Sequence, residues 1–248
     1  MSAVDVVLAN NDRVTLRVGD TYVKVDADAH RSEKEAEAIE LAPVPVPEVL
    51  WQQRSVLALA GLPGRTLGRL GEPDSASTEA WVAVGSALRA LHDAALPPWP
   101  DKTEAELHQR IDDGSAWLVD NGVLPAGVVE ANRRLARGVI RPYEPAFVHG
   151  DLHIEHVFVD GDRVTGFIDW SEARCGDPAY DLATLALGHP ERLDDLLRGY
   201  GREVDENVIR GWWSWRCLGS IRWLVENGYG AAETLPEAAV LVANAATH

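Results

Sequence analysis

The chain has 248 residues, of which 46% are hydrophobic and 25% are charged, so it is long enough for one large domain or two lobes with substantial cores. Its formal net charge of −16 disfavours nucleic acid as a partner. No stretch of eighteen apolar residues predicts a membrane span and no signal-peptide pattern opens the chain, so we expect a cytoplasmic protein without a membrane partner.

Residues 13–25 predict the first elements, two strands joined by a tight turn at Gly19-Asp20. Apolar and polar residues alternate along both strands with a period of two. The alternation puts Lys24 on the opposite face from Val23 and Val25. We expect the valines to pack inward or against a neighbouring helix, which leaves Lys24 facing a cleft.

Residues 31–41 predict a helix that ends before Pro43, because proline blocks its continuation. The helix carries acids on several faces, and Glu33, Glu35 and Glu37 are each candidates for the partner of a strand lysine. Most exposed glutamates are only solvated, so the helical pattern alone does not choose among the three.

The proline-rich link that follows, residues 43–50, leads to a short apolar run at residues 55–61. That run is too short for a normal helix and predicts a buried strand. We place a lobe boundary just after it, near Leu62-Pro63-Gly64. This boundary divides the chain into residues 1–62 and residues 63–248.

Two later segments predict helices with an apolar stripe, residues 81–92 and residues 209–224. The second segment also carries tryptophans away from its stripe, Trp212, Trp215 and Trp223. They either line a substrate cleft or fill a junction between helices. Junction packing is favoured, because a chain with nine tryptophans and only three phenylalanines uses tryptophan as core material.

The segment at residues 101–120 is rich in acids. Its basic residues are Lys102 and Arg110, and its six carboxylates are Asp101, Glu104, Glu106, Asp112, Asp113 and Asp120. Such a segment either forms an acidic cleft wall that attracts a cationic substrate or is the solvated face of a helix. Both hypotheses stay open at the level of sequence.

The densest cluster of chemical groups is His149-Gly150-Asp151-Leu152-His153-Ile154-Glu155-His156, and Ile168-Asp169-Trp170 follows it. The residues between the two motifs, 157–168, predict a hairpin of two short strands. A hairpin returns the chain to its starting edge. We therefore expect His156 and Asp169 to lie side by side.

Two carboxylates and a loop imidazole suit metal-assisted phosphoryl transfer, in which one carboxylate stands beside the attacking hydroxyl group. Asp151 is our candidate for that carboxylate. His156 and Asp169 are our candidates for holding magnesium, because each lies in a loop at a strand edge.

These motifs resemble the catalytic and metal-binding loops of the aminoglycoside phosphotransferases and their protein-kinase-like relatives. In that family the first motif usually reads His-Gly-Asp-x-His-x-x-Asn, and the second reads Ile-Asp-Trp or Ile-Asp-Phe. The chain departs at His156, where asparagine is usual, but the macrolide phosphotransferases of the family resemble it at this position. The resemblance implies a two-lobed α+β fold like that of protein kinases. Residues 1–62 would form a small strand-rich lobe, and residues 63–248 a larger, mainly helical lobe.

The resemblance also implies roles for residues outside the two motifs. Lys24 would neutralise the phosphates of ATP or GTP, and Glu35 would hold Lys24 in place. Backbone groups from Leu59 to Gly61 would line the pocket for the nucleotide base. Asp181 would bond back to the catalytic loop and touch no substrate.

The implied function is a nucleotide-dependent phosphotransferase that uses Mg²⁺ and phosphorylates a hydroxyl group of a small molecule. The family resemblance suggests an aminoglycoside-type antibiotic or a related amino sugar as the acceptor, with a macrolide as the alternative. A role in antibiotic resistance follows only from the resemblance. The sequence indicates no oligomeric state and does not choose between ATP and GTP.

Two functions of other classes stay open. A nucleotide-binding regulator with little catalysis is suggested by His156, because magnesium prefers oxygen ligands to imidazole nitrogen. A metallohydrolase is suggested by the density of histidines between His149 and His156. A hydrolase with two metals needs further ligands after other strands, and the remaining histidines lack such spacing.

Overall fold

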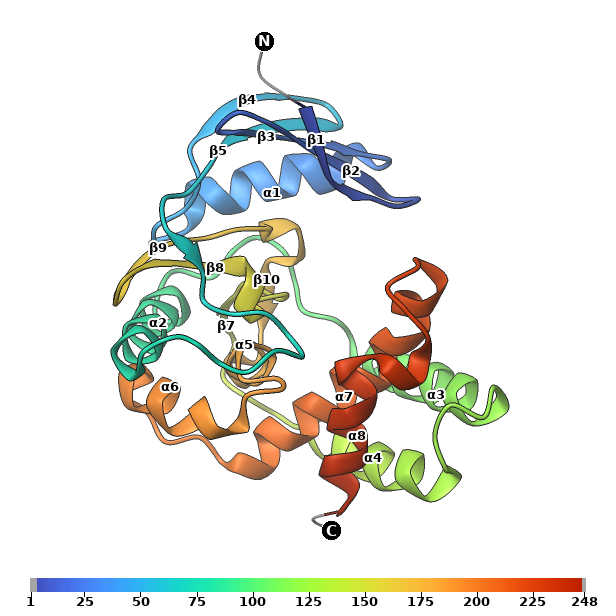
Figure 1. Cartoon of the computed structure of the whole chain (residues 1–248). Helices are drawn as coiled ribbons and strands as arrows, with labels where there is room; N and C mark the ends of the chain where they lie inside the picture. The colour runs from blue at the N-terminus through green and yellow to red at the C-terminus, as the bar shows by residue number, and fades with distance from the viewer. Residues whose placement is uncertain (1–3, 247–248) are drawn as a thin grey trace.

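The computed structural model describes residues 4–246 and arranges them as two groups of elements, one above the other (Figure 1). The upper group is an antiparallel sheet with the strand order β1-β2-β3-β5-β4 and one helix, α1, beneath it. Its elements are β1 (Val4–Ala9), β2 (Arg13–Val18), β3 (Thr21–Asp26), α1 (Ala29–Leu41), β4 (Val49–Gln53) and β5 (Val56–Ala60).

The β2–β3 hairpin forms as predicted, but the prediction of which face packs inward is wrong. Val25 is 39% exposed, whereas Lys24 and Asp26 on the other face are buried. The reason is that α1 packs on the charged face and places Glu35 against Lys24. Burial of charged groups is tolerated when they are paired, so pairing overrides the alternation of hydrophobicity here.

The predicted buried strand is β5, which lies between β3 and β4 in the sheet. Its side chains Leu57 and Leu59 are buried. The predicted helix after β3 is α1, which begins two residues earlier than expected because the side chain of Asp28 accepts a hydrogen bond from the N–H of His30. Such a cap satisfies a backbone donor that the first turn leaves free.

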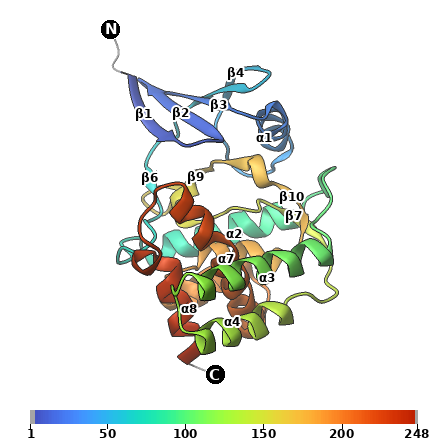
Figure 2. The same cartoon turned by 90° about the vertical axis from the view of Figure 1, so that its right-hand side faces the viewer.

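The lower group is mainly helical and, with the upper group, gives the mixed α+β composition that we expected (Figures 1 and 2). Its larger helices are α2 (Thr78–His92), α3 (Glu104–Asp120), α4 (Ala126–Gly138), α5 (Pro178–Leu185), α6 (Leu193–Tyr200), α7 (Glu206–Glu226) and α8 (Pro236–Ala246). Short 3₁₀ turns are η1 (Ile154–His156), η2 (Trp170–Glu172), η3 (Pro190–Arg192) and η4 (Ala232–Thr234). Among the described helices, none is long and apolar enough to cross a bilayer.

Two small sheets in the lower group hold the predicted motifs. The strands are β6 (Arg65–Thr66), β7 (Ala146–Val148), β8 (Val157–Asp160), β9 (Arg163–Phe167) and β10 (Arg174–Gly176). The β8–β9 hairpin forms as predicted, β6 pairs with β8, and β7 pairs with β10. The chain passes from the upper sheet to β6 through Gly64, where an added Cβ would lie 2.1 Å from the carbonyl oxygen of Val159. Only glycine permits this close approach, which fixes the β6 segment against the hairpin.

Two tryptophans of α7 serve the helix junction, as the sequence favoured. Trp212 and Trp215 are buried and both pack edge-on against Tyr180 of α5. Trp223, near the end of the same helix, is instead 41% exposed and lies beside Tyr229. The first two are core residues, whereas Trp223 is available at the surface.

Candidate active site

The upper sheet and α1 bring together Lys24 and Glu35, which form a buried ion pair. Glu33 and Glu37, the other two candidates on this helix, are exposed. The Nζ atom of Lys24 also lies 3.3 Å from Oδ1 of Asp169 in the lower group. The lysine therefore bridges the two groups of elements, with one carboxylate on each side.

Arg13 of β2 completes this network, and sequence reasoning did not identify it. Its guanidinium contacts three carboxylates: Asp26 at 2.6 Å, Glu35 at 3.1 Å and Asp169 at 2.8 Å. Two cations thus face three carboxylates, which leaves one net negative charge. In the sequence, Arg13 alternates with Thr15 and Arg17 on one face of the strand. Solvent-exposed residues show the same alternation, so the sequence does not single out Arg13 as a site residue.

The catalytic-loop candidate Asp151 follows β7, and Asp181 of α5 fixes the backbone before it. The carboxylate of Asp181 accepts hydrogen bonds from the N–H groups of His149, at 2.7 Å, and Gly150, at 2.9 Å. Gly150 has a φ of +82°, and an added Cβ would lie 2.3 Å from the carbonyl oxygen of Glu172. The expected anchoring contacts of Asp181 are therefore present.

His149 ties the loop to the second motif. Its ring is fully buried beside Trp170, and burial lowers its pKa to about 4, so the imidazole is neutral. Its Nε2 lies 3.0 Å from the carbonyl oxygen of Ile168, which can only accept, so Nε2 carries the proton. The N–H of Asp151 in turn donates to Nδ1 of His149 at 3.3 Å. One neutral imidazole thereby holds the two motifs at a fixed separation.

The side chain of Asp151 is held by Arg216 of α7, whose guanidinium lies 2.7 Å from Oδ1. Burial alone would raise the pKa of Asp151, but Arg216, His156 and His153 lower it to about 2. The carboxylate is therefore ionised, and its orientation is set by the contact of Oδ1 with Arg216, which leaves Oδ2 out of that contact. Sequence reasoning missed Arg216, although a charged residue within the apolar run from Trp212 to Leu218 was an available signal.

The structure brings the two magnesium candidates together at the base of the hairpin. Nδ1 of His156 lies 2.8 Å from the carbonyl oxygen of Asp151 and must donate to it, so in the neutral ring Nε2 is the nitrogen left to bind a metal. That Nε2 lies 3.8 Å from Oδ2 of Asp169, whose other oxygen is bound by Arg13 and Lys24. One imidazole nitrogen and one carboxylate oxygen converge, a donor set that fits a divalent cation.

Asp169 has features that set it apart from an ordinary loop residue. Burial would raise the pKa of its carboxyl group, but Lys24, His156 and Arg13 hold it well below its usual range. Its backbone has a φ of +64°, in the left-handed region that side chains other than glycine rarely adopt. Such strain is concentrated at functional sites, because the surrounding structure must maintain it.

A second way to hold a metal involves Asp151, His153 and His156, whose potential ligand atoms lie within 4.8 Å of one another. Burial holds the pKa of His153 well below its usual value, so this ring is neutral. Within residues 4–246 no other group of three potential ligands of this kind is present.

The predicted base-binding residues lie at the end of β5, where the backbone is already engaged. The N–H of Gly61 donates to the carbonyl oxygen of Asp20 at 2.6 Å, and the N–H of Ala60 donates to Glu48 at 2.9 Å. Leu59 is paired within the sheet and buried. The contribution of Leu59 and Gly61 to a base pocket stays a prediction. The N–H groups of Ala60 and Gly61 are already hydrogen-bonded within the protein and are not free to contact a purine.

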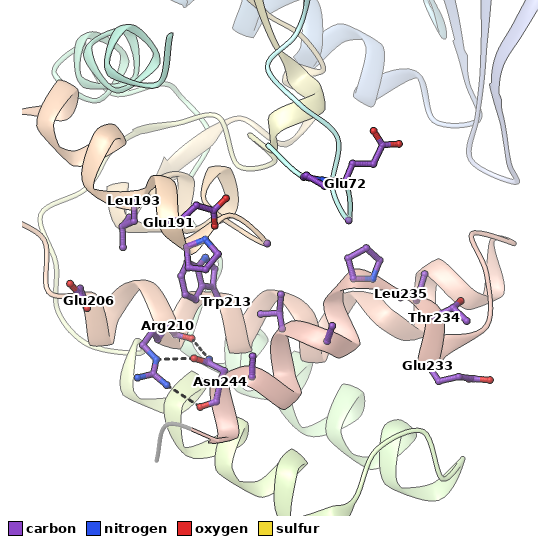
Figure 3. A pocket seen from close by; sticks show the side chains of 18 of the residues that line it. Glu72, Glu191, Leu193, Glu206, Arg210, Trp213, Glu233, Thr234, Leu235 and Asn244 are labelled. Atoms are coloured by element: carbon purple, nitrogen blue, oxygen red, sulfur yellow. Dashed lines mark hydrogen bonds between the residues drawn. The ribbon is translucent and has the colours of Figure 1, made fainter. Parts of the chain in front are cut away.

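A pocket of about 950 Å³ lies beside α7 and the start of α8, and Figure 3 shows it from close by. Carboxylates dominate its polar lining: Glu72, Glu191, Asp194, Glu206 and Glu233. Arg210, which also lines it, is hydrogen-bonded to Asn244 at 2.8 and 2.9 Å (Figure 3). Neither Asp151 nor Asp169 lines this pocket, so it is not the site of the ion network described above.

Residues 3–217 match the family described as the phosphotransferase enzyme family. Viomycin phosphotransferase from Streptomyces vinaceus is 34% identical over 166 residues, which are 61% of this chain and 56% of that protein. The chain thus spans little more than half the length of this curated relative.

Two groups of solved structures have the same fold. An aminoglycoside 2'-phosphotransferase-IIIa in complex with GDP aligns with a TM-score of 0.75 and 16% identity, over 100% of this chain and 93% of that one. A macrolide 2'-phosphotransferase type I aligns with a TM-score of 0.68 and 23% identity, over 99% and 90%. At these identities the likeness establishes a shared two-lobed, kinase-like architecture and no more.

Proposed function

The chain belongs to the phosphotransferase enzyme family, and from this premise we propose that it transfers the γ-phosphoryl group of ATP or GTP to a hydroxyl group of a small molecule. The observation that carries the proposal is the position of Asp169. One of its oxygens contacts Lys24 and Arg13, and the other faces Nε2 of His156. In this proposal a single carboxylate joins the lysine that would bind phosphate to the pair that would bind the metal, an arrangement suited to phosphoryl transfer.

In the proposed reaction the acceptor oxygen attacks the γ-phosphorus while the bond from that phosphorus to the β-phosphate oxygen breaks, and a nucleoside diphosphate leaves. The hydroxyl proton passes to Oδ2 of Asp151, since Oδ1 is held by Arg216. A carboxylate with a pKa of about 2 is a weak base. Its first task is therefore to orient the hydroxyl group, and it takes the proton only as bond formation makes that group acidic.

The residues of the upper sheet would handle the donor phosphates. Lys24 would neutralise the charge that develops on them, and Glu35 would keep its ammonium group in place. His156 and Asp169 would hold a divalent cation. When bound, such a cation would supply positive charge that offsets the charge of the donor phosphates. The single net negative charge of the network fits the binding of a cation there.

The acceptor is the open part of the proposal. An aminoglycoside-type antibiotic or a related amino sugar is the sequence-based prediction, with a macrolide as the alternative and antibiotic resistance as the corresponding role. Viomycin phosphotransferase, the curated relative, carries the name of another antibiotic. ATP or GTP as donor and a cytoplasmic location also stay predictions.

The proposal is tested by nucleoside diphosphate release from ATP or GTP in the presence of Mg²⁺ and a panel of aminoglycosides, macrolides, amino sugars and hydroxylated acids. We expect release that depends on an acceptor and disappears when EDTA removes the metal or when Asp169 is changed to Asn. The Asp160→Asn variant is the matched control, because Asp160 is exposed at the end of β8. Equal release from wild type and Asp169→Asn would contradict the proposal.

A nucleotide-binding regulator is the alternative of another class. It predicts tight binding of ATP or GTP but no phosphorylated product with any acceptor. Metal-dependent transfer to any alcohol would exclude it. The ionised, oriented carboxylate of Asp151 favours an enzyme, because a regulator has no use for a proton acceptor beside the phosphates.

A further inference from the structure

Arg110 of α3 is a solvent-exposed cation close to the proposed transfer site. No carboxylate among residues 4–246 forms an ion pair with it, although most other arginines near the site have such a partner. Arg216 pairs with Asp151, for example, and Arg174 pairs with Asp101 at 2.9 Å. Arg110 is therefore a charged group whose function the reaction described above does not explain.

The side chain of Arg110 is seated on α7, which lies alongside α3 (Figure 2). Its guanidinium carbon lies 4.9 Å from the ring centre of Trp215. An added Cβ on Gly219 would lie 2.2 Å from its Nε, so the missing side chain at Gly219 makes room for the arginine. The contact with Trp215 and the close approach to Gly219 restrict the orientation of the guanidinium.

This seat places Arg110 beside the catalytic loop. Gly219 lies three residues after Arg216, so the two share one face of α7 one turn apart. Arg216 reaches from that face to Asp151. Burial lowers the pKa of Arg110, as does the nearby charge of Arg216, while Tyr180, Glu172 and Asp151 act in the opposite direction.

Other cations gather around the same part of the molecule. Glu172 is close enough to interact electrostatically with both Arg110 and Lys34. The pKa of Lys34 is also lowered by the nearby charges of Lys102, Arg31 and Arg174. The cations of this neighbourhood are Arg31, Lys34, Lys102, Arg110, Arg174 and Arg216. The acids that interact with them include Asp101, Glu106, Asp151, Glu172, Asp181 and Glu237. The neighbourhood as a whole therefore has no excess of positive charge, and the case for an anionic ligand rests on Arg110 itself.

Two of the acids of residues 101–120 are engaged within the protein. Asp112 pairs with Arg133 at 2.7 Å and Arg137 at 2.9 Å, both on α4. Glu106 completes the cap of its own helix. Arg110 of α3 is close enough to Asp151 to interact with its charge, and at this point the guanidinium repels a cation and attracts an anion.

We propose that Arg110 binds a carboxylate group of the phosphate acceptor, so that the substrates of this protein are hydroxylated carboxylic acids. The inference rests on the proposed transfer at Asp151. A guanidinium is the side chain best matched to a carboxylate, with two parallel hydrogen bonds. A singly charged carboxylate fits better than a phosphate ester, because Asp151 and Glu172 nearby repel a second negative charge.

The test compares matched acids and amides on the full chain. L-homoserine, L-serine and 4-hydroxybutyrate are each measured beside their amides, with kanamycin as an amino sugar that lacks a carboxylate. Binding is followed by ligand-observed NMR, and transfer by nucleoside diphosphate release with MgATP or MgGTP. We expect the wild type to prefer at least one acid over its amide by about tenfold or more.

Three variants locate the source of that preference. Arg110→Met keeps the packed stem over Trp215 but removes the charge, and it should abolish the preference. Gly219→Ala keeps the charge but displaces the guanidinium, and it should weaken the preference. Arg163→Met, on the exposed turn of the β8–β9 hairpin, is the matched control and should change nothing. Circular dichroism confirms that each variant is folded.

The outcomes separate this inference from the proposed function. The inference is wrong if the wild type binds every amide as well as its acid, or if Arg110→Met retains the preference. It is also wrong if kanamycin is phosphorylated with a KM that Arg110→Met leaves unchanged. In that last case the proposed function stands. A different result is a preference for acids that is lost in Arg110→Met, together with transfer that does not depend on Asp151. That result supports the carboxylate site and rejects the proposed reaction.

Discussion

The two sides of the proposed active site differ in how their charges are satisfied. On the nucleotide side, Arg13, Lys24 and Glu35 are buried and bonded to one another and to Asp169. On the acceptor side, Arg110 is exposed and has no ion pair among residues 4–246. The fold supplies the partners of the first set of charges, whereas our proposal gives Arg110 a partner on the substrate.

This difference indicates where stability and where specificity reside. Buried paired charges hold a fixed geometry, but they become costly as soon as one partner is lost. An exposed cation contributes little to folding and is free to select a ligand. Substitutions on the nucleotide side should therefore change stability and catalysis together, and those on the acceptor side should change selectivity alone.

The largest expected effect is on stability, from Arg13→Met. The change leaves the buried carboxylates of Asp26 and Glu35 short of a partner, at a cost of about 3–5 kcal/mol. Arg17→Met on the same strand, where the side chain is exposed, should change stability by less than about 0.5 kcal/mol. Urea unfolding measures both, and equal destabilisation of the two variants would remove the proposed contrast between paired and free charges.

Glu35→Gln should have the next largest effect. The ammonium group of Lys24 loses the carboxylate that holds it in place, so kcat/KM should fall about 100- to 1000-fold. Glu33→Gln, on the exposed face of the same helix, provides the control. If steady-state kinetics give the same kcat/KM for both variants, Glu35 does not position the lysine.

Arg216→Met should alter the pH profile of kcat. Burial favours the neutral form of Asp151 and Arg216 opposes it, so removing the guanidinium raises the Asp151 pKa from about 2. Transfer needs the ionised carboxylate, and the acid limb of the profile should therefore move to higher pH. Arg222→Met on the same helix, where the side chain is exposed, should leave the limb in place. An unmoved limb in Arg216→Met would show that this contact does not act on Asp151.

The same contact has a consequence for stability. Because the folded-state pKa of Asp151 lies below its unfolded value of about 3.9, its contribution is present above that value and is lost as the pH falls through about 2. Arg216→Met should reduce the loss of stability over this acidic window. Unfolding curves recorded across the window provide the measurement.

His156→Asn should change the choice of metal by a smaller factor. An amide oxygen suits Mg²⁺ better than an imidazole nitrogen does, whereas Mn²⁺ accepts both. The ratio of activity with Mn²⁺ to activity with Mg²⁺ should therefore fall in the variant. Titration of each metal into the wild type and the variant gives the ratio. An unchanged ratio would argue that Nε2 of His156 does not contact the metal.

Trp223→Ala should have the smallest effect. The indole is 41% exposed and lies 5.6 Å, between ring centres, from Tyr229. Its removal should change stability by no more than about 0.5 kcal/mol, since no core packing is lost. Trp215→Ala, by contrast, removes a fully buried ring and should cost about 3–5 kcal/mol. Thermal unfolding of the pair separates the two roles of tryptophan in α7.

The residue pattern by itself predicted one local contact, since a short hairpin joins His156 and Asp169. The pairing of Lys24 with Glu35 and the contact of Asp181 with the catalytic loop were implied by the family resemblance. The contacts that sequence reasoning missed span the chain: Arg13 and Asp169 are 156 residues apart, and Arg216 and Asp151 are 65 apart. Hydrophobic period and motif spacing carry no information on such pairs. The same limit explains Val25, whose exposure depends on which face of the sheet α1 covers.

The most direct test of the account compares nucleotide binding with phosphate transfer in Asp151→Asn. The account predicts that the variant binds MgATP or MgGTP within about twofold of the wild type, while transfer to the best acceptor falls by a factor of about 100 to 10,000. Asp160→Asn should match the wild type in both measurements. Transfer by Asp151→Asn at the wild-type rate would contradict the central claim that this carboxylate receives the hydroxyl proton.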